Sequence, residues 1–192
     1  CAEGQIDATH LARGELDEVE WERLVKVADR MMKTHLYFDD TSSTTVMDIR
    51  SRARRLKAEH GLDLIAIDYL QLIQAPGRVE NRTLAVAEMT RSLKILAREL
   101  NVPIVVLSQL SRATEGRSDK RPMLSDLRES GSIEQDADIV MFLYREDYYN
   151  QDTENANITE LSIAKHRNGA TDTIKMYFQK EYTRFRDLAR EP

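Results

Sequence analysis

The sequence predicts an α/β fold with a mainly parallel central sheet flanked by helices. Short apolar runs alternate with longer segments of helical period, and the runs at residues 64–67 and 104–107 contain no polar residue. Strands of a parallel sheet are covered on both faces, so they read as continuous apolar runs. Strand–helix–strand alternation is typical of α/β proteins, and 192 residues suffice for one sizeable core. We therefore expect residues 1–192 to form a single domain.

Three segments have apolar side chains at helical spacing. The first follows Asp17 and Glu20, which are placed to form a helix-capping pair. The second runs through residues 46–56, and Gly61 can end it. The third runs through residues 86–100. These three segments supply the helices of the predicted fold.

Further short runs predict the remaining strands. Residues 36–38 and 139–143 are apolar enough to form strands. Near the end of the chain, residues 158–164 and 173–178 have β-like patterns on either side of the Asn-Gly turn at 168–169. We expect these two segments to pair as an antiparallel C-terminal hairpin.

The composition excludes several classes of protein. Hydrophobic residues make up 41% and charged residues 32%, as in ordinary globular proteins, and the apolar runs are too short to cross a bilayer. The single cysteine, Cys1, excludes an internal disulfide framework and favours a reducing compartment, so we expect a cytoplasmic protein. The four scattered histidines do not have metal-ligand spacing. Neither a membrane association nor a zinc site is expected.

The charge distribution limits where nucleic acid can bind. The net charge of −5 argues against non-specific coating of duplex DNA. Residues 1–40 are acidic on balance and residues 41–137 slightly basic, so a nucleic-acid site is expected in the middle stretch. The densest basic cluster lies at residues 50–57. Its apolar stripe and following glycine favour an outer helix with a solvated basic face over a main DNA contact.

Polar residues follow both buried strands, at the edge where open α/β sheets bind ligands. Asp68 comes directly after residues 64–67, the pattern of a Walker B strand whose carboxylate holds nucleotide-bound Mg²⁺ through water. The alternative is an aspartate that caps a loop. Gln109 closely follows residues 104–107 and is placed to orient water or sense a γ-phosphate. Its alternative is a loop amide bonded to backbone.

Four longer motifs occur in order along the chain: DYLQL at 68–72, SQLSR at 108–112, DLRESGSIEQDAD at 126–138 and KHRNG at 165–169. Together they closely resemble the C-terminal motor domain of the DnaB family of bacterial replicative helicases, and the likeness runs along nearly the whole chain. The resemblance implies a RecA-like fold, ATP and Mg²⁺ as cofactors, and a homohexameric ring around single-stranded DNA. It also implies primase and a helicase loader as partners.

The resemblance implies catalytic and cofactor-binding roles for four residues. Asp68 is similar to the Walker B carboxylate, and Gln109 to the glutamine that links the nucleotide to the DNA-binding loops. Lys165 and Arg167 resemble the pair that reaches into the neighbouring subunit's ATP site, with Arg167 as an arginine finger. The two cations stand two apart on a predicted strand, so both point to one face. A solvated surface pair is the alternative.

The resemblance also implies a DNA-binding loop. Arg128, Glu129 and Gly131 are similar to the loop that holds the single-strand backbone in the central channel of the ring. Ser132 and Gln135 form an S-x-x-Q capping pattern, which would let backbone N–H groups face a phosphate. From the residues alone, an ordinary capped turn is an equal alternative.

The sequence departs from the family in one respect. No G-x-x-x-x-G-K-[ST] loop, which cradles nucleotide phosphates, occurs in the 192 residues. In the family this loop lies upstream of the segment matching Cys1. Because the chain does not start with Met, we expect a longer protein, with the N-terminal part of the domain missing here. We predict an ATP-dependent DNA helicase that couples hydrolysis at subunit interfaces to movement on single strands, with this fragment alone inactive.

Two other functions stay open. A non-catalytic RecA-like assembly or DNA-binding module would keep the same shell without hydrolysis, and the residues upstream of Cys1 would discriminate it from a motor. Another RecA-type ATPase is a third possibility, which the amino-acid sequence of residues 128–138 disfavours.

Overall fold

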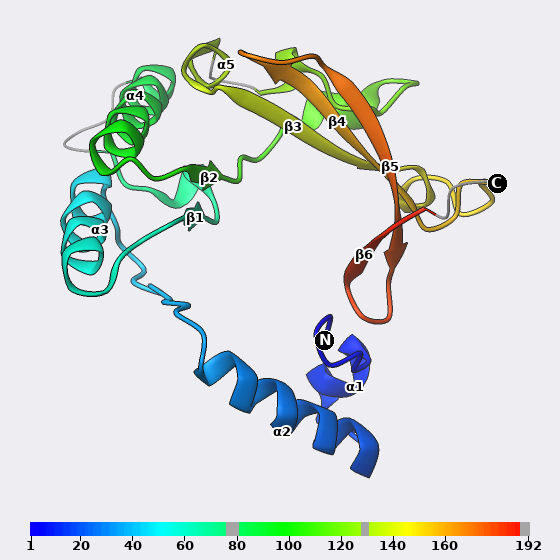
Figure 1. Ribbon diagram of the computed structural model, residues 1–192. Helices are drawn as coiled ribbons and strands as arrows, with labels where there is room; N and C mark the ends of the chain where they lie inside the picture. Colours follow the sequence, from blue (N-terminus) through cyan, green and yellow to red (C-terminus); the bar gives the residue numbers. More distant parts are fainter. Residues whose placement is uncertain (76–80, 128–130, 189–192) are drawn as a thin grey trace. The chain divides into compact units, whose positions relative to one another are not determined.

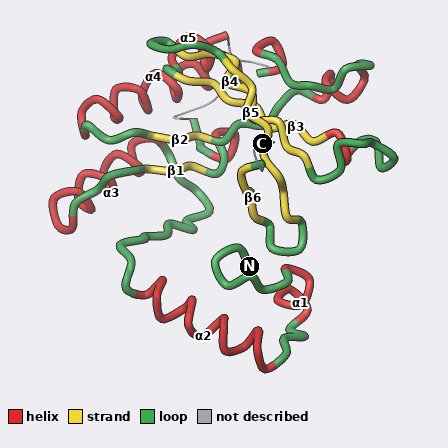
Figure 2. The backbone as a smooth tube through the Cα atoms, turned by 45° about the vertical axis from the view of Figure 1, so that its right-hand side comes forward, coloured by secondary structure: helices red, strands yellow, loops and turns green. Residues whose placement is uncertain are grey.

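The computed structural model describes residues 1–75, 81–127 and 131–188 (Figure 1). Helices and strands alternate along most of the chain, as expected of an α/β protein. Figure 2 separates the helices, strands and connecting loops by colour. Within the described ranges, no helix is long and apolar enough to cross a membrane.

The chain divides into two compact units, each built from segments distant in sequence. The first unit consists of Cys1–Asp39, Leu143–Ser162 and Asp172–Pro192, and the second of Asp40–Phe142 and Ile163–Thr171. The interpretation of residues 1–192 as one domain stays a prediction. The second unit contains the residues singled out for chemistry.

The second unit is built around a parallel strand pair. It contains α3 (Val46–His60), β1 (Ile65–Ile67), α4 (Arg82–Leu100), β2 (Ile104–Val106) and α5 (Gly131–Asp136). Figure 1 shows α3 and α4 on one side of the β1–β2 pair. The register places Ile65 opposite Ile104 and Ile67 opposite Val106. This parallel pair confirms the two strands expected from the continuous apolar runs. Their expected burial on both faces is wrong for the described residues, since Ala66 and Val105 are exposed.

Caps fix the ends of the two long helices of this unit. Thr45 and Asp48 form a capping box at the start of α3, and Gly61 ends it with a φ of 82°, which L-residues rarely adopt. Asn81 caps α4, and Asn101 ends it in the left-handed region. The predicted apolar stripe of α4 is buried in full and packs toward β1 and β2; it comprises Val86, Met89, Leu93, Leu96 and Leu100.

The first unit contains α1 (Ala8–Arg13) and α2 (Glu18–Met32). The predicted capping box of Asp17 and Glu20 is present. The apolar stripe of α2 is largely exposed: the exposed fractions are 55% for Trp21 and 79% for Met32. Instead, the charged residue Glu20 is buried in α2.

The C-terminal strands form a second sheet in the order β3 (Ile139–Arg145), β4 (Ile158–His166), β5 (Asp172–Gln179) and β6 (Arg184–Asp187). β4 and β5 are neighbours joined by a short turn, as predicted. β5 and β6 pair antiparallel, and the Phe178 and Phe185 rings lie opposite each other with centroids 4.9 Å apart. β6 was not expected from the sequence.

One predicted strand is wrong. Residues 36–38 form irregular chain, and the Phe38 side chain is 83% exposed. An apolar run becomes a strand only where a neighbouring strand takes up its backbone hydrogen bonds. No described residue pairs with this segment in a ladder.

Candidate functional site

The carboxyl ends of β1 and β2 form the centre of the candidate site. The Leu107 N–H donates to the Ile67 carbonyl at 2.9 Å, and the Leu70 N–H donates to the Leu107 carbonyl at 2.9 Å. The parallel register continues in this way for one residue past each strand. Asp68 and Gln109 therefore leave the sheet at the same edge, where ligands of such sheets bind.

Asp68 is exposed at the end of β1. Its carboxylate has no hydrogen bond or ion pair with a described residue, so it caps neither the following loop nor a helix. The Asp68–Tyr69 peptide bond is cis. A loop-capping role does not fit Asp68, because its carboxylate makes no hydrogen bond with a described residue. The Walker B interpretation fits its exposure.

Gln71 joins the two strand ends. It lies in the 3₁₀ helix Leu70–Leu72. Its Oε1 accepts the Gln109 N–H at 3.2 Å, and its Nε2 donates to Ser108 Oγ at 3.1 Å. Gln71 belongs to the DYLQL motif, from which no role was expected for it. The signal that it mattered is a polar side chain between two apolar ones in a motif beside a strand end.

Gln109 presents its side chain to solvent. The residue is exposed, and its amide side chain makes no hydrogen bond with the described part of the chain. Its backbone groups are used instead: the N–H donates to Gln71, and the carbonyl accepts from Ser108 Oγ at 3.5 Å. The interpretation as a loop amide bonded to backbone therefore does not fit, because that amide is unengaged.

Lys165 and Arg167 lie at the end of β4 and in the turn after it. Lys165 Nζ donates to the carbonyls of Glu134 and Ala137, the latter at 2.9 Å, and Arg167 Nη2 donates to the Gln135 carbonyl at 2.9 Å. These carbonyls belong to the last turn of α5 and the residue after it, where cations are favourable. The prediction of two cations on one strand face and the alternative of a solvated surface pair are each incomplete, because both cations cap a helix of their own chain.

Asp138 adds a carboxylate to this group. It forms an ion pair with Lys94, and Arg167 Nη1 lies 3.3 Å from Asp138 Oδ1. The hydrogen bond from Lys94, together with the charges of Lys94 and Arg167, lowers the pKa of Asp138, against its partial burial. Arg167 itself is 42% exposed. Its contacts are therefore ones that solvent screens.

The expected DNA-binding loop is described only in part. Arg128 and Glu129 lie outside the described residues, and Gly131 begins α5. A Cβ added at Gly131 would meet nothing within 4 Å, and its φ is not in the left-handed region. Neither steric crowding inside the protein nor backbone conformation requires glycine here, which leaves room on the outer side for another molecule to approach.

The predicted capping pattern of Ser132 and Gln135 is wrong in register. Because α5 begins at Gly131, Ser132 is inside the first turn rather than at the cap, and its buried Oγ has no partner among the described residues. α5 is held instead from outside: Thr90 Oγ1 of α4 donates to Asp136 Oδ2 at 2.6 Å.

The basic cluster of α3 is largely paired. Arg50 and Arg54 both contact Glu99 of α4, the former at 2.6 Å, and Arg55 contacts Glu59 at 2.9 Å. The Arg54 hydrogen bond is the main reason why the pKa of Glu99 is lowered. These ion pairs favour the interpretation of α3 as an outer helix over a main DNA contact.

The described residues fit one kind of metal site. They contain no group of three or more His, Cys, Asp or Glu side chains able to hold a metal ion. Nucleotide-bound Mg²⁺, however, needs only one or two carboxylates, since phosphates and waters complete its shell. The exposed, unpaired Asp68 suits that requirement.

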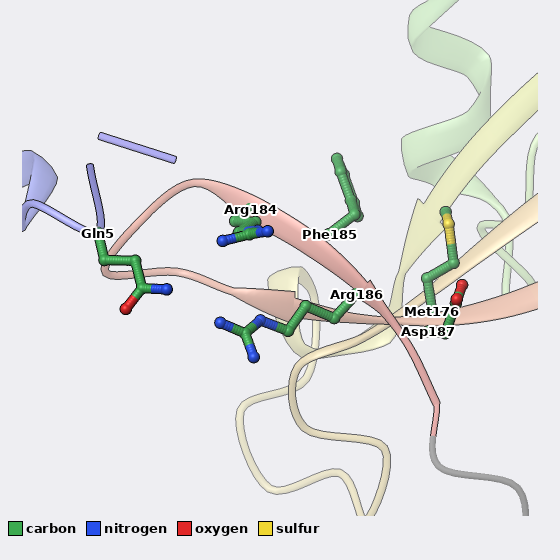
Figure 3. Close-up of a pocket in the computed structure, with 6 residues that line it drawn as sticks. All are labelled: Gln5, Met176, Arg184, Phe185, Arg186 and Asp187. Carbon is green, nitrogen blue, oxygen red and sulfur yellow. The ribbon is translucent and has the colours of Figure 1, made fainter. Parts of the chain in front are cut away.

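A shallow groove in the first unit contains none of the predicted site residues. Figure 3 shows it along β6, with the guanidinium groups of Arg184 and Arg186 beside each other. Gln5, Met176, Phe185 and Asp187 complete its lining.

Sequence comparison gives a consistent match. Residues 1–187 match the family described as the DnaB-like helicase C terminal domain. The chain is 58% identical to the replicative DNA helicase DnaB of Geobacillus stearothermophilus and 55% identical to the replicative DNA helicase DnaC of Bacillus subtilis, each over 191 residues. Each alignment covers 99% of this chain and 42% of the relative, so the chain spans less than half of these relatives' length.

Solved structures agree in fold. A DnaB-like replicative helicase, described with its interactions with primase, matches with a TM-score of 0.93 and 42% identity over 98% of this chain and 46% of its own. A structure described as an ATPase domain matches with a TM-score of 0.92 and 42% identity over 98% of this chain and 68% of its own. Together with the family match, these structures confirm the predicted RecA-like α/β fold.

Proposed function

Because this chain belongs to the DnaB-like helicase C-terminal domain family, we propose that it is the ATPase and DNA-translocation part of a hexameric replicative DNA helicase. ATP hydrolysis at subunit interfaces then drives movement on single-stranded DNA and unwinding of the duplex, in the cytoplasm. The observation that carries the proposal is the pairing of β1 with β2, which brings Asp68 and Gln109 to one edge with unengaged side chains.

The two strand-end residues have complementary roles in this proposal. Asp68 orients the water shell of Mg²⁺ on ATP, and Gln109 senses the γ-phosphate. Phosphoryl transfer is catalysed mainly by positioning and charge neutralisation. Gln71 supports both, since it fixes the backbone of Gln109 relative to the segment that follows Asp68. The phosphates themselves need a cradle, and no G-x-x-x-x-G-K-[ST] loop occurs in the 192 residues.

Arg167 and Lys165 act on the ATP of the neighbouring subunit. Arg167 is half-exposed and bound to one carbonyl and one exposed carboxylate, contacts that it can exchange for phosphate oxygens. A guanidinium meets two such oxygens at once, and an arginine supplied in trans contributes about 10³–10⁵ in turnover in well-studied cases.

DNA is held by the loop at Arg128, Glu129 and Gly131 in the channel of a homohexamer. The open space at Gly131 allows a sugar–phosphate backbone to come close. Primase, seen with one relative, and a helicase loader are the proposed protein partners.

A subunit-mixing experiment in the complete protein tests the proposal. Arg167→Ala subunits are mixed with Asp68→Asn subunits, and ATPase activity is compared with that of either variant alone. An arginine acting across the interface predicts recovery in the mixture, because some sites then combine an intact Asp68 with an intact Arg167 from next door. Native mass spectrometry serves as the control that mixed rings form.

If mixed rings form without recovery, Arg167 does not act in trans, and its role is the helix cap seen within this chain. The isolated 192-residue chain supplies a second test. It should show no ATPase above background, since no phosphate cradle is present in the sequence. Mg²⁺-dependent turnover by this chain would contradict the proposal.

A further inference from the structure

Asp126 is a buried carboxylate that the proposed function does not use. It ends the 3₁₀ helix Leu124–Asp126, and only 4% of the residue is exposed. A charge in such a position must be paired and hydrogen-bonded, otherwise the fold is strongly destabilised. The contacts of Asp126 therefore show which segments of the chain it connects.

Arg117 supplies the pairing. Its guanidinium donates to both carboxylate oxygens of Asp126, at 3.1 and 2.7 Å, and also to the Arg121 carbonyl at 2.9 Å. The Met123 N–H donates to Asp126 Oδ2 at 2.8 Å. The fork of two parallel bonds fixes orientation as well as distance. We call Arg117 and Asp126 with these contacts the Arg117–Asp126 clamp.

The clamp lies between the two functional segments of the chain. The Ser111 N–H donates to the Asp126 carbonyl at 2.9 Å. Ser111 follows Gln109 by two residues, and Asp126 precedes Arg128 by two. One backbone hydrogen bond thus joins the segment after β2 to the segment that precedes the proposed DNA-binding loop, and the ion pair holds the Asp126 end of that bond.

The fold does not depend on the clamp alone at this point. Leu127, the next residue, is buried in a core cluster with Val140 and Phe142. The apolar core therefore keeps the segment attached, while the clamp determines how its backbone is oriented.

We propose that Arg117 and Asp126 are positioning residues that hold the segment before the DNA-binding loop in register with Gln109 and so couple DNA binding to ATP hydrolysis. This inference rests on the proposed function of Gln109 and Arg128. Coupling between two sites is carried by packed side chains and by networks of hydrogen bonds and salt bridges that connect them. The clamp and the Ser111 bond form such a connection over described residues.

The experiment uses the complete protein and three variants: Arg117→Gln, Asp126→Asn and both together. Basal ATPase, ATPase stimulated by single-stranded oligonucleotide, and melting temperature are measured. Stimulation by DNA should fall about tenfold, within the range typical of coupling between sites, while basal ATPase is unchanged. The double variant should be no worse than either single variant, because both remove one interaction.

A matched control is present in the chain. Arg145 and Asp147 form a second forked pair of similar burial, outside the unit that contains Gln109. Arg145→Gln and Asp147→Asn should lower the melting temperature without changing the ratio of stimulated to basal ATPase. Arg117→Lys, which keeps the charge but not the fork, covers the case in which Arg117→Gln does not fold, and should also lower the ratio.

The inference is overturned if the ratio stays at the wild-type value in every folded Arg117 and Asp126 variant, or falls equally in the controls. Failure of the proposed function looks different: wild-type protein would then show no DNA-stimulated ATPase at all.

Discussion

Asp68 and Asp147 both follow the end of a strand, yet their surroundings are opposite. Asp68 is exposed at the end of β1 and has no ion-pair partner among the described residues. Asp147, in the 3₁₀ helix Glu146–Tyr148 after β3, is 8% exposed and accepts four hydrogen bonds. Two come from Arg145 at 3.0 and 3.2 Å, one from Lys180 at 2.7 Å and one from the Asn157 N–H at 3.1 Å.

In our interpretation, Asp147 contributes to the stability of the fold, and Asp68 contributes to the proposed function. Arg145, Lys180 and the Asn157 N–H hold the pKa of Asp147 far below its usual range, in spite of its burial. Its partners come from three strand-end segments of one unit, so the carboxylate stabilises the fold. Asp68 contacts no charged partner among the described residues, and we propose that it serves the ligand of the candidate site instead.

The largest expected effect separates the two aspartates in activity. Asp68→Asn in the complete protein should lower ATPase by about 10³-fold or more, because placement of Mg²⁺ contributes several kcal/mol to transition-state stabilisation. Steady-state turnover and thermal melting measure it, and the melting temperature should not change. Asp63→Asn, another exposed aspartate near β1, is the control. An active Asp68→Asn protein would show that Asp68 and Asp147 do not differ in role as proposed.

Asp147→Asn should show the reverse behaviour. It leaves two cations facing a neutral amide, and the free energy of unfolding should fall by about 3 kcal/mol, at the low end for broken buried pairs because Lys180 is half-exposed. Denaturant titration measures the loss, and Asp152→Asn, exposed in the same region, should lose little. A stable Asp147→Asn protein would mean that the hydrogen bonds survive without the charge.

The same comparison has a pH signature. A carboxyl whose folded pKa is lowered contributes stability above its unfolded pKa, about 3.9 for Asp, and loses it as pH falls toward the folded value. The stability difference between wild type and Asp147→Asn should therefore be constant above about pH 5 and shrink below about pH 4. A difference that is flat down to pH 2 would contradict the assigned role.

A Gln71→Leu variant tests how the strand-end site is held together. It removes two hydrogen bonds to the Gln109 and Ser108 segment, each worth about 1 kcal/mol, so turnover should fall by up to about thirtyfold. Gln74→Leu is the control, because Gln74 makes its side-chain bond to Ser43 instead. Wild-type turnover in Gln71→Leu would show that Gln109 is placed by other contacts.

The smallest expected effect is the contribution of His10 to the stability of the α1–α2 contact. A hydrogen bond to the carboxylate of Glu20, at 3.1 Å, raises the pKa of His10 and fastens α1 to α2. This contribution is complete below about pH 6.5 and is lost as pH rises through the folded pKa. Amide exchange in α1 should therefore be faster at pH 8.5 than at pH 5.5 after correction for intrinsic rates, and His10→Gln should remove the difference.

The sequence was sufficient where one segment carries its own signal. Continuous apolar runs predict β1 and β2, and the first polar residues after them are Asp68 and Gln109. The apolar stripe of α4 predicts a buried helix, and all its members are buried. In each case a local pattern of apolar residues predicts the element, and for the two strands it also marks the candidate residue that follows.

What could not be predicted depends on contacts between distant segments. Gln71 meets residues 37 and 38 positions away, and the ion pair of Arg117 with Asp126 needs a loop closed over nine. β6 has the charged sequence Arg-Phe-Arg-Asp, which becomes a strand only because β5 offers an edge. The run at 36–38 is apolar but is offered no such edge among the described residues.

Gly131 shows how function and folding place different demands on one position. Alanine is a better helix former than glycine by about 1 kcal/mol in a helix interior, and a methyl group here meets no atom within 4 Å. In a mutant library screened for expression, alanine at this position should be retained or enriched. In the same library screened for growth that depends on replication, bulky substitutions such as Gly131→Val should be lost. Positions that behave oppositely in two such screens would outline the DNA path without a bound strand.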